Sequence, residues 1–348
     1  MNDINNNTSG VMSPRIEVNR LPLSKQVPLD TPFSVTLVPS TYCNFACSFC
    51  PVKEISDKPS LMSIETAKNI IDNANFPQQV KVLHLYNVGE PLINKDFIKI
   101  IKYARQTNFA HRISTVTNAS LLTKNLSEEL IASGVDRIII SLYGLNDDDY
   151  LKTTKKKIKF ETIYENIKYL NSIKGDCEIF VKVIDRVTPT EQTRQEFINK
   201  FKEISTFYSI ETILPIWPNF RPEKDDPSQR EDFQRGLYEG VPAIDRVACH
   251  YPFYSMVVNP KGIVNPCLAD WDGLLKLGDT NNSSLNEIWN AKEYQDFRYE
   301  QLSGQRKEHP LCRTCGTLKA ATAPDDDMDE DRLYLLDKLF GDRIKQSA

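Results

Sequence analysis

The stretch STYCNFACSFCP, residues 40–51, places three cysteines within eight residues, at Cys43, Cys47 and Cys50. It follows the apolar, β-branched run FSVTLVPS at residues 33–40, which is typical of a buried strand. Three thiolates at Cys-x3-Cys-x2-Cys spacing can hold three irons of a [4Fe–4S] cube and leave the fourth iron open to another ligand. A structural zinc site takes four ligands, and the nearest downstream Cys or His is His84. The stretch therefore predicts an iron–sulfur site with one open position.

Short β-branched runs alternate with amphipathic segments from residue 33 to about residue 220. We expect strands at 33–40, 80–86, 112–118, 137–144, 178–185 and 210–217, and helices at 62–74, 95–107, 124–134, 160–174 and 191–205. Strands that alternate with helices pair in parallel through right-handed crossovers. Six such units favour an α/β fold, a partial (β/α)6 TIM-type barrel, with a doubly wound open sheet as the alternative. In both folds the chemistry belongs at the carboxyl ends of the strands, where the three-cysteine loop emerges.

The remaining chain predicts a smaller C-terminal domain. The full division is a flexible leader (1–30), the barrel (31–220), a linker (221–240), the C-terminal domain (241–320) and an acidic, helical tail (321–348). The leader is polar and Asn-rich, with no pattern that could bury a face, so we exclude it from the fold. Within the C-terminal domain, residues 248–267 predict a β-hairpin around an Asn-Pro-Lys-Gly turn, and residues 283–298 predict one helix.

Composition excludes several classes of protein. The net charge is −4, from 43 basic and 47 acidic residues, and the two signs are mixed along the sequence. This composition indicates neither a nucleic-acid-binding surface nor a basic membrane-binding surface. No run of eighteen apolar residues occurs, and the first residues lack the apolar core of a signal peptide. We therefore expect a cytoplasmic protein, in which eight cysteines are metal ligands or catalytic thiols rather than disulfides.

The cysteine motif, with the aromatic residue Phe49 before its last cysteine, resembles the signature of radical S-adenosylmethionine (SAM) enzymes. In that family the open iron chelates the amino and carboxylate groups of SAM. The reduced cluster then cleaves SAM to a 5′-deoxyadenosyl radical, which takes a hydrogen atom from the substrate. The resemblance also implies a flavodoxin- or ferredoxin-type electron donor.

The stretch NVGEP, residues 87–91, resembles the family's Gly-Gly-Glu motif at Gly89 and Glu90, with Val88 replacing the first glycine. The resemblance implies that Glu90 accepts a hydrogen bond from the amino group of SAM. A short side chain beside it lets the backbone approach the ligand.

Other positions resemble SAM-binding positions of the family less specifically. Asn118 and Ser141, at the ends of the third and fourth strands, match positions that bind the ribose or carboxylate of SAM. Phe49 would pack against the adenine, and residues 213–217 would contact it through their backbone. Without the cysteine loop, Asn118 is equally well explained as a turn cap and Ser141 as a hydrogen-bonded strand end.

A second group of four cysteines lies beyond the barrel, at Cys249, Cys267, Cys312 and Cys315. The spacing Cys249-x12-Gly262-x4-Cys267 resembles the opening of SPASM/twitch domains of radical SAM enzymes. Four ligands from three segments form a closed site, for an auxiliary [4Fe–4S] cluster or, alternatively, for zinc. With four cysteines this domain is similar to the one-cluster version found in 2-deoxy-scyllo-inosamine dehydrogenase. A closed cluster suits electron transfer better than substrate binding.

The resemblance implies a radical SAM oxidoreductase that removes a hydrogen atom from a sugar or aminocyclitol and passes a second electron to the auxiliary cluster. The alternatives are a radical SAM enzyme that modifies peptides or proteins, by crosslinking, epimerisation or sulfatase maturation, and a zinc-stabilised binding protein on a degenerate barrel. An alcohol oxidation also needs a base. Lys182 and Asp185, near the active end of the fifth strand, are the candidates, with a salt-bridged barrel lysine as the alternative for Lys182.

Three further features carry weaker expectations. We expect Cys177 to be a core cysteine and His84 to be a hydrogen-bonded interior histidine. His250, Tyr251 and Tyr254, next to Cys249, are expected to wrap the auxiliary cluster rather than to touch substrate.

Overall fold

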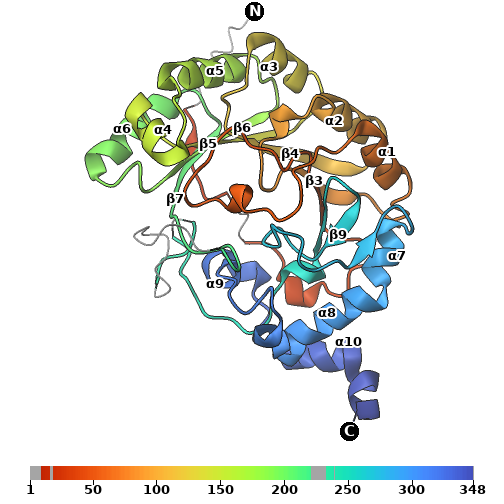
Figure 1. Cartoon of the computed structure of the whole chain (residues 1–348). Coiled ribbons are helices and arrows are strands. Elements are labelled where there is room, and N and C mark those ends of the chain that lie inside the picture. The colour runs from red at the N-terminus through yellow and green to blue at the C-terminus, as the bar shows by residue number, and fades with distance from the viewer. Residues whose placement is uncertain (1–8, 16–18, 221–232, 239, 348) are drawn as a thin grey trace, which may run out of the picture.

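The computed structural model describes residues 9–15, 19–220, 233–238 and 240–347. In this part of the chain ten strands form one sheet, in the order β1-β7-β6-β5-β4-β3-β2-β8-β9-β10. Its six central strands are parallel: β2 (Ser34–Leu37), β3 (Val80–Leu85), β4 (Ala110–Thr117), β5 (Arg137–Leu142), β6 (Glu178–Ile184) and β7 (Phe207–Glu211). The helices of this region cover the outer face (Figure 1): α1 (Ile64–Asp72), α2 (Phe97–Gln106), α3 (Lys124–Ile131), α4 (Asp147–Thr154), α5 (Phe160–Ser172) and α6 (Glu191–Phe201). The predicted partial barrel is confirmed.

The strands have two chemically different faces. In β4, Arg112, Ser114 and Val116 line an internal cavity, whereas Ile113 is completely buried in the main hydrophobic core. This is the period-two alternation of a strand, with the apolar side chains turned outward against the helices. The interior face therefore combines polar and charged groups with apolar side chains such as Val116, and a site can be built there.

Three predicted elements need correction. The sixth strand was placed at 210–217, but β7 starts at Phe207 and ends at Glu211, and residues 212–217 are irregular. Helix α4 was missed, because its sequence DDDYLKTT buries only Tyr150 and two threonines and has no apolar stripe. The predicted helix at 283–298 is two helices, α7 (Leu285–Asn290) and α8 (Lys292–Ser303), because the extended Ala291 interrupts them.

The described part of the leader belongs to the fold. Strand β1 (Val11–Met12) pairs in parallel with β7, and the 3-10 turn η1 (Leu23–Lys25) buries Leu23 in a small core with Phe253 and Leu335. The exclusion of residues 1–30 is therefore wrong for this part, while residues 1–8 and 16–18 lie outside the described residues. The domain boundaries themselves stay predictions, and most of the predicted linker, 221–232 and residue 239, also lies outside the described part.

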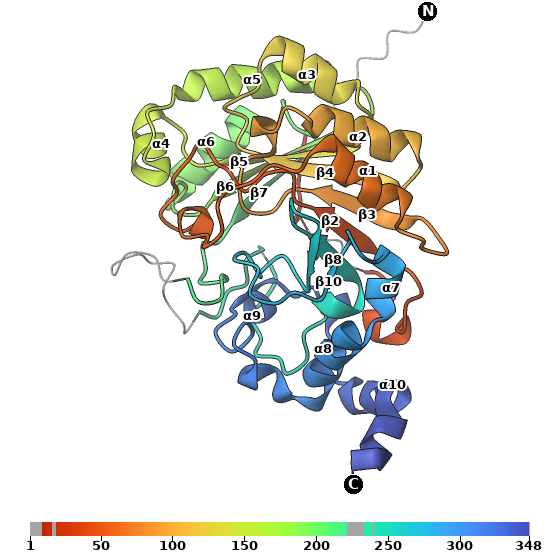
Figure 2. The same ribbon diagram turned by 45° about the vertical axis from the view of Figure 1, so that its right-hand side comes forward.

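The C-terminal region extends the barrel sheet. Strand β8 (Ser255–Val258) pairs in parallel with β2, and β9 (Ile263–Asn265) returns antiparallel to it, which confirms the predicted hairpin. Strand β10 (Gly278–Asp279) completes the edge. Helices α7, α8, α9 (Thr317–Ala321) and α10 (Arg332–Ser347) follow. The region lies on one side of the barrel, with α10 packed on α8 and projecting away from the barrel (Figure 2).

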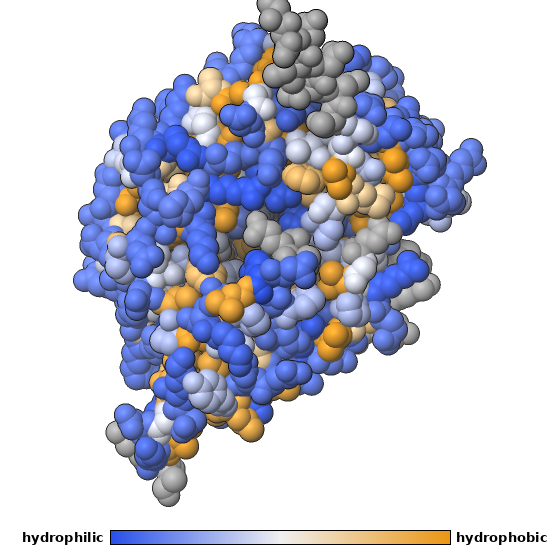
Figure 3. Space-filling view, turned by 180° about the vertical axis from the view of Figure 1, so that it is seen from behind, coloured by the Kyte–Doolittle hydropathy of each residue, from blue (hydrophilic) through white to orange (hydrophobic). Residues whose placement is uncertain are grey.

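The outer surface is mainly polar. Seen from behind, it carries hydrophilic side chains broken by small, separate apolar areas (Figure 3). Among the described residues, no helix has both the length and the apolar character needed to span a bilayer.

Candidate active site

The three-cysteine loop follows β2 and is fixed by backbone hydrogen bonds to its surroundings. The N–H of Ala46 donates to the carbonyl of Thr154 at 2.9 Å, and the N–H of Glu90 donates to the carbonyl of Tyr42 at 2.7 Å. Within the loop, the N–H of Phe45 donates to the Cys43 sulfur at 3.4 Å. These contacts hold the loop against α4 and the end of β3, with its thiols on the wall of the cavity.

The three thiols are neighbours in a buried environment. Burial raises the pKa of Cys43, Cys47 and Cys50, the last to about 12. The other cysteines of the loop raise the pKa of Cys47 and Cys50 further, and the charge of Glu90 raises that of Cys43. A bound metal reverses this preference, because it stabilises the thiolate directly. The residues present therefore fit a metal cluster better than free thiols.

Glu90 lies 2 % exposed beside the loop, in the turn after β3. Its Oε1 accepts from the Thr117 hydroxyl at 2.7 Å and its Oε2 from the Asn118 N–H at 2.8 Å. Burial raises the pKa of Glu90 to about 7, against the opposing effect of these hydrogen bonds. Ionisation at that site costs about 3 kcal/mol relative to an exposed glutamate. Among the described residues Glu90 has no cationic partner. Its carboxylate is therefore fixed in position by hydrogen bonds but is not neutralised by a positive charge.

Gly89 brings this carboxylate close to the cysteine loop. It has φ +107°, and a Cβ built on it would stand 2.3 Å from the carbonyl oxygen of Ser40 and 2.9 Å from that of Tyr42. Only glycine permits this approach. The predicted Gly89–Glu90 pair and the cysteine loop are thus parts of one site.

The other predicted SAM contacts also line the cavity, whose volume is about 510 Å³. The Asn118 amide nitrogen donates to Asn44 Oδ1 in the cysteine loop at 2.9 Å, while its oxygen accepts from Ser120, so it both links the loop and caps a turn. Ser141 lies on the adjoining wall, and the Phe49 ring centroid is 6.0 Å from that of Tyr143. The structure brings all five predicted SAM residues to one side of the cavity.

The four distal cysteines meet beside the barrel. Burial raises the pKa of Cys249 to about 12 and that of Cys267 well above its ordinary value, with the other cysteines of the group among the further causes. The N–H of Cys315 donates to the carbonyl of Cys312 at 3.2 Å, and buried Arg306 donates to the carbonyl of Cys315 at 3.2 Å. A cation there suits a site that gathers several thiolates.

The spacing of these thiols bears on which metal they suit. Within the described residues, no three His, Cys, Asp or Glu side chains converge closely enough to hold one metal ion. A single zinc brings its ligands to about 2.3 Å from one point, whereas a cube binds each thiolate at a different iron. Four cysteine thiolates are a ligand set that suits either zinc or an iron–sulfur cluster.

Comparison with known families decides the assignment. A model of the radical SAM superfamily matches residues 37–201, and a model of the SPASM iron–sulfur cluster-binding domain matches residues 249–316. This chain belongs to the radical SAM superfamily, with a C-terminal SPASM domain. Its cofactors are accordingly a [4Fe–4S] cluster with SAM and an auxiliary iron–sulfur cluster. From their geometry, Cys43, Cys47 and Cys50 would hold the first, and the four distal cysteines the second.

Relatives of this radical SAM protein act on different molecules. An AdoMet-dependent heme synthase of Oleidesulfovibrio alaskensis is 24% identical over 325 residues, or 78% of this chain and 79% of the relative. The structure of BtrN in complex with AdoMet and 2-DOIA has a TM-score of 0.54 at 17% identity and covers 84% of this chain and 96% of that one. Streptococcus suis SuiB bound to precursor peptide SuiA has a TM-score of 0.61 at 18% identity and covers 85% and 72%. The structural likenesses show the fold alone.

The two candidate bases of this radical SAM protein are placed differently. Lys182 lines the cavity, and its Nζ lies 2.7 Å from Glu211 Oε2. Asp185 does not line the cavity: its Oδ1 accepts from the N–H of Ile213 at 3.2 Å, and it lines a separate hollow. Asp185 sits just past the strand, where the chain has already turned away from the interior. Asp185 therefore lies outside the cavity that Lys182 lines, and its role as the base stays a prediction.

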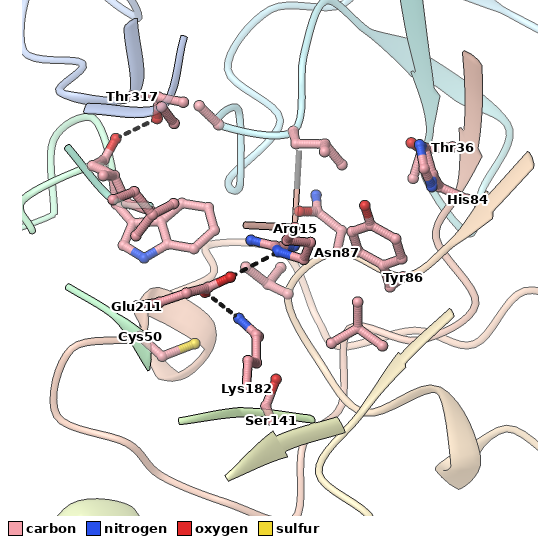
Figure 4. A pocket seen from close by; sticks show the side chains of 18 of the residues that line it. Arg15, Thr36, Cys50, His84, Tyr86, Asn87, Ser141, Lys182, Glu211 and Thr317 are labelled. Carbon is pink, nitrogen blue, oxygen red and sulfur yellow. Dashed lines mark hydrogen bonds and ion pairs between the residues drawn. The ribbon is translucent and has the colours of Figure 1, made fainter. Parts of the chain in front are cut away.

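Sequence reasoning missed two charged residues beside Lys182. Glu211 accepts from both Lys182 and Arg15, whose Nε lies 2.9 Å from Glu211 Oε1 (Figure 4). Glu211 stands at the end of a misplaced strand, and Arg15 stands in the leader excluded from the fold.

The aromatic group after Cys249 also reaches the cavity. His250 and Tyr254 stack with ring centroids 5.7 Å apart and planes at 3°, and Tyr251 lies 4.5 Å from His250. All three line the cavity, which corrects the expectation that they only wrap the auxiliary cluster. They form the wall between the cavity and the four distal cysteines.

We expect SAM binding to weaken as the pH falls, because only ionised Glu90 is a full acceptor for the SAM amino group. Glu90 loses its charge as the pH falls through about 7, so the Kd for SAM should rise about tenfold per pH unit below that value. Calorimetric titration of the reconstituted protein between pH 6 and 8 measures this. Glu90→Gln should bind SAM more weakly and with a smaller pH dependence, and a pH-independent Kd in the unaltered protein would contradict the role.

Proposed function

We propose that this protein oxidises a hydroxyl-bearing carbon of a small polar molecule, a sugar or an aminocyclitol, by two electrons. The observation that carries the proposal is the single cavity, bounded by the three-cysteine loop on one side and by the aromatic wall beside Cys249 on the other. Bound cluster and SAM supply the radical that removes a hydrogen atom from the substrate. A substrate in this cavity lies between both metal sites.

The remaining atoms and electrons can be placed on this chain. After loss of the hydrogen atom, the substrate carbon must lose one electron and its hydroxyl must lose a proton to form a carbonyl. Cys249 and its three partners would hold the auxiliary cluster, which would supply the acceptor for that electron. The hydroxyl proton can go to Lys182 as Lys182 passes a proton to the ionised Glu211 carboxylate, 2.7 Å away, so that Lys182 stays cationic in the resting site.

The experiment is anaerobic reconstitution followed by analysis of metal and products. We expect about eight irons per chain and release of 5′-deoxyadenosine with dithionite. A panel of sugars and aminocyclitols should then yield a ketone, detected as deuterium incorporation after borodeuteride reduction. Bound zinc without SAM cleavage would overturn the enzyme assignment. SAM cleavage with ketone formation from none of the panel, but modification of a peptide, would replace the substrate class.

We also propose where the reductant docks. A lysine patch, defined as Lys53, Lys152, Lys155, Lys156 and Lys157, is exposed next to the cysteine loop. The carbonyl of Thr154, directly before Lys155, bonds to Ala46 in that loop. Within the described residues none of these lysines forms an ion pair. The patch fits an acidic flavodoxin- or ferredoxin-type protein, which it would bring close to the cluster.

Reversal of three charges should separate docking from chemistry. In Lys155→Glu/Lys156→Glu/Lys157→Glu, we expect 5′-deoxyadenosine formation driven by reduced flavodoxin to fall at least about tenfold at low salt. Formation driven by dithionite should not change, because dithionite needs no docking surface. The matched control reverses Lys95, Lys102 and Lys307, which are exposed elsewhere. Equal losses in both triple variants would show a general charge effect and contradict the docking site.

A further inference from the structure

The cavity beyond the SAM contacts is rich in cationic side chains. Five basic residues line the cavity, compared with three acidic ones: Arg15, Arg20, Arg112, Arg137 and Lys182 against Glu90, Glu211 and Asp326. Arg112 and Arg137 are paired with Glu178, so they add little free positive charge. Two of the three carboxylates are already committed. Glu90 is assigned to the amino group of SAM, and Asp326 pairs with Arg20 at 2.9 Å. The carboxylate that remains is Glu211.

Glu211 has to serve two cations. Its two oxygens accept separately from Lys182 and Arg15, at 2.7 and 2.9 Å. Burial raises the pKa of Glu211, but the charges of Arg15 and Lys182 outweigh it and leave the pKa lowered, so the carboxylate is ionised. The three groups lie together in the cavity (Figure 4), and their sum is one positive charge when Lys182 is protonated.

Donors remain free for a ligand at this point. Lys182 uses one of its three N–H donors on Glu211. Arg15 uses Nε on Glu211 and a further N–H on the Tyr238 side chain, which leaves part of its five-donor guanidinium available. The two side chains are 18% and 19% exposed, which is exposure to the cavity they line. A buried carboxylate that holds two cations leaves unsatisfied positive charge, which is costly until an anion arrives.

His84 on β3 extends the same surface. Its Nδ1 is buried and has no hydrogen-bond partner among the described residues, which corrects the expectation of a hydrogen-bonded interior histidine. Burial, followed by the charges of Arg15, Arg112 and Arg137, lowers the pKa of His84 to about 4. The imidazole is therefore neutral, and one ring N–H can donate to a ligand without adding a further charge. His84, Arg15 and Lys182 all appear in the same close view (Figure 4).

We propose that the substrate carries a carboxylate or phosphate group, which binds to Arg15 and Lys182 beside Glu211. This inference rests on the proposed function and narrows it. An acidic sugar or sugar phosphate would neutralise the net positive charge of Glu211, Arg15 and Lys182. The ammonium of an aminocyclitol would add a third cation to the same place. Of the two substrate classes named above, the charge of the cavity therefore favours an acidic sugar.

SAM also has a carboxylate, and Lys182 is paired in register with Ser141, which is assigned to SAM. Arg15 is the better discriminator, because it comes from the leader and reaches the cavity beside Glu211 and Tyr238. If these cations served SAM alone, loss of Arg15 would weaken SAM binding. If they serve the substrate, it would weaken substrate binding and leave SAM unaffected.

The test is calorimetric titration of reconstituted protein saturated with SAM, using four probes: glucuronate, glucose 6-phosphate, glucose and glucosamine. They share one ring and differ in charge. We expect the two anions to bind at least about tenfold more tightly than glucose, and glucosamine to bind most weakly. Inorganic phosphate, which has no sugar ring, tests the anion site by itself. Absence of binding by both phosphate and the acidic sugars would overturn the proposal.

Variants locate the effect. Arg15→Met should remove most of the advantage of glucuronate over glucose, and Arg15→Lys should restore part of it. Lys99→Met, which removes an exposed charge paired with Asp96, is the matched control and should retain the full advantage. Weaker SAM binding in Arg15→Met, with the preference for anions unchanged, would assign these cations to SAM and sink the proposal. Phosphate binding without any SAM cleavage would instead uphold the anion site and reject the proposed function.

Discussion

Replacement of Cys47 by alanine should abolish release of 5′-deoxyadenosine and remove about four irons per chain. Cys47 is the most buried thiol of the loop, at 8% exposure, and lies between the other two ligands. Two remaining cysteines cannot hold a cube at three of its corners, so the open iron that would bind SAM is lost with it. Iron analysis, electron paramagnetic resonance of the reduced protein and chromatography of the nucleoside measure the effect.

The chain offers a matched control for this variant. Cys177 is also buried, at 6% exposure, and belongs to neither cysteine group, as the sequence predicted. Cys177→Ala should keep its iron and its SAM cleavage, apart from a modest loss of stability from the small cavity. If Cys47→Ala keeps the cube signal and still releases 5′-deoxyadenosine, the three-cysteine assignment is wrong.

The second large effect is expected in Cys312→Ala, which should separate SAM cleavage from oxidation of the substrate. This variant should lose the auxiliary cluster and form no oxidised product, because the substrate's second electron then has no acceptor. SAM cleavage should continue, since the three-cysteine loop and Glu90 are untouched. Parallel measurement of 5′-deoxyadenosine and ketone gives the amount of ketone formed per SAM cleaved, which should fall to near zero in this variant.

Folding must be checked, because Cys312 is 7% exposed and belongs to the main core. Cys312→Ser keeps the volume but is a poor iron ligand, and it should give the same separation if the effect is redox in origin. Product formed at the normal rate in both variants, with the auxiliary cluster absent, would contradict the electron-acceptor role.

The sequence predicts the repeating parts of the fold because apolar periodicity is strong there. Strands such as 137–142 and helices such as 97–106 bury continuous apolar faces. It does not predict α4, whose sequence is dominated by Asp and Lys. It also misses β1, because a two-residue strand has no pattern of its own and gains its place from backbone bonds to the edge of β7.

The residues of the candidate site also fall into those that the sequence predicts and those that it does not. Cys43, Cys50 and Glu90 were found because their chemistry depends on local spacing. Arg15 and Glu211 were not, since their meeting depends on a contact across 196 positions of the chain. Charge pairs formed by tertiary packing leave no local signature, whereas ligand loops do.

The continuous sheet also fixes the distance between the two cysteine groups. The three-cysteine loop follows the end of β2, while Cys249 precedes the start of β8, and these strands are joined by a fixed ladder from Ser34 with Ser255 to Leu37 with Val258. A slip of one residue would displace one cysteine group against the other by about 3.3 Å. The backbone ladder thus fixes the separation of the two cysteine groups. Under the proposed function, strand pairing would then set how far the substrate's second electron has to travel.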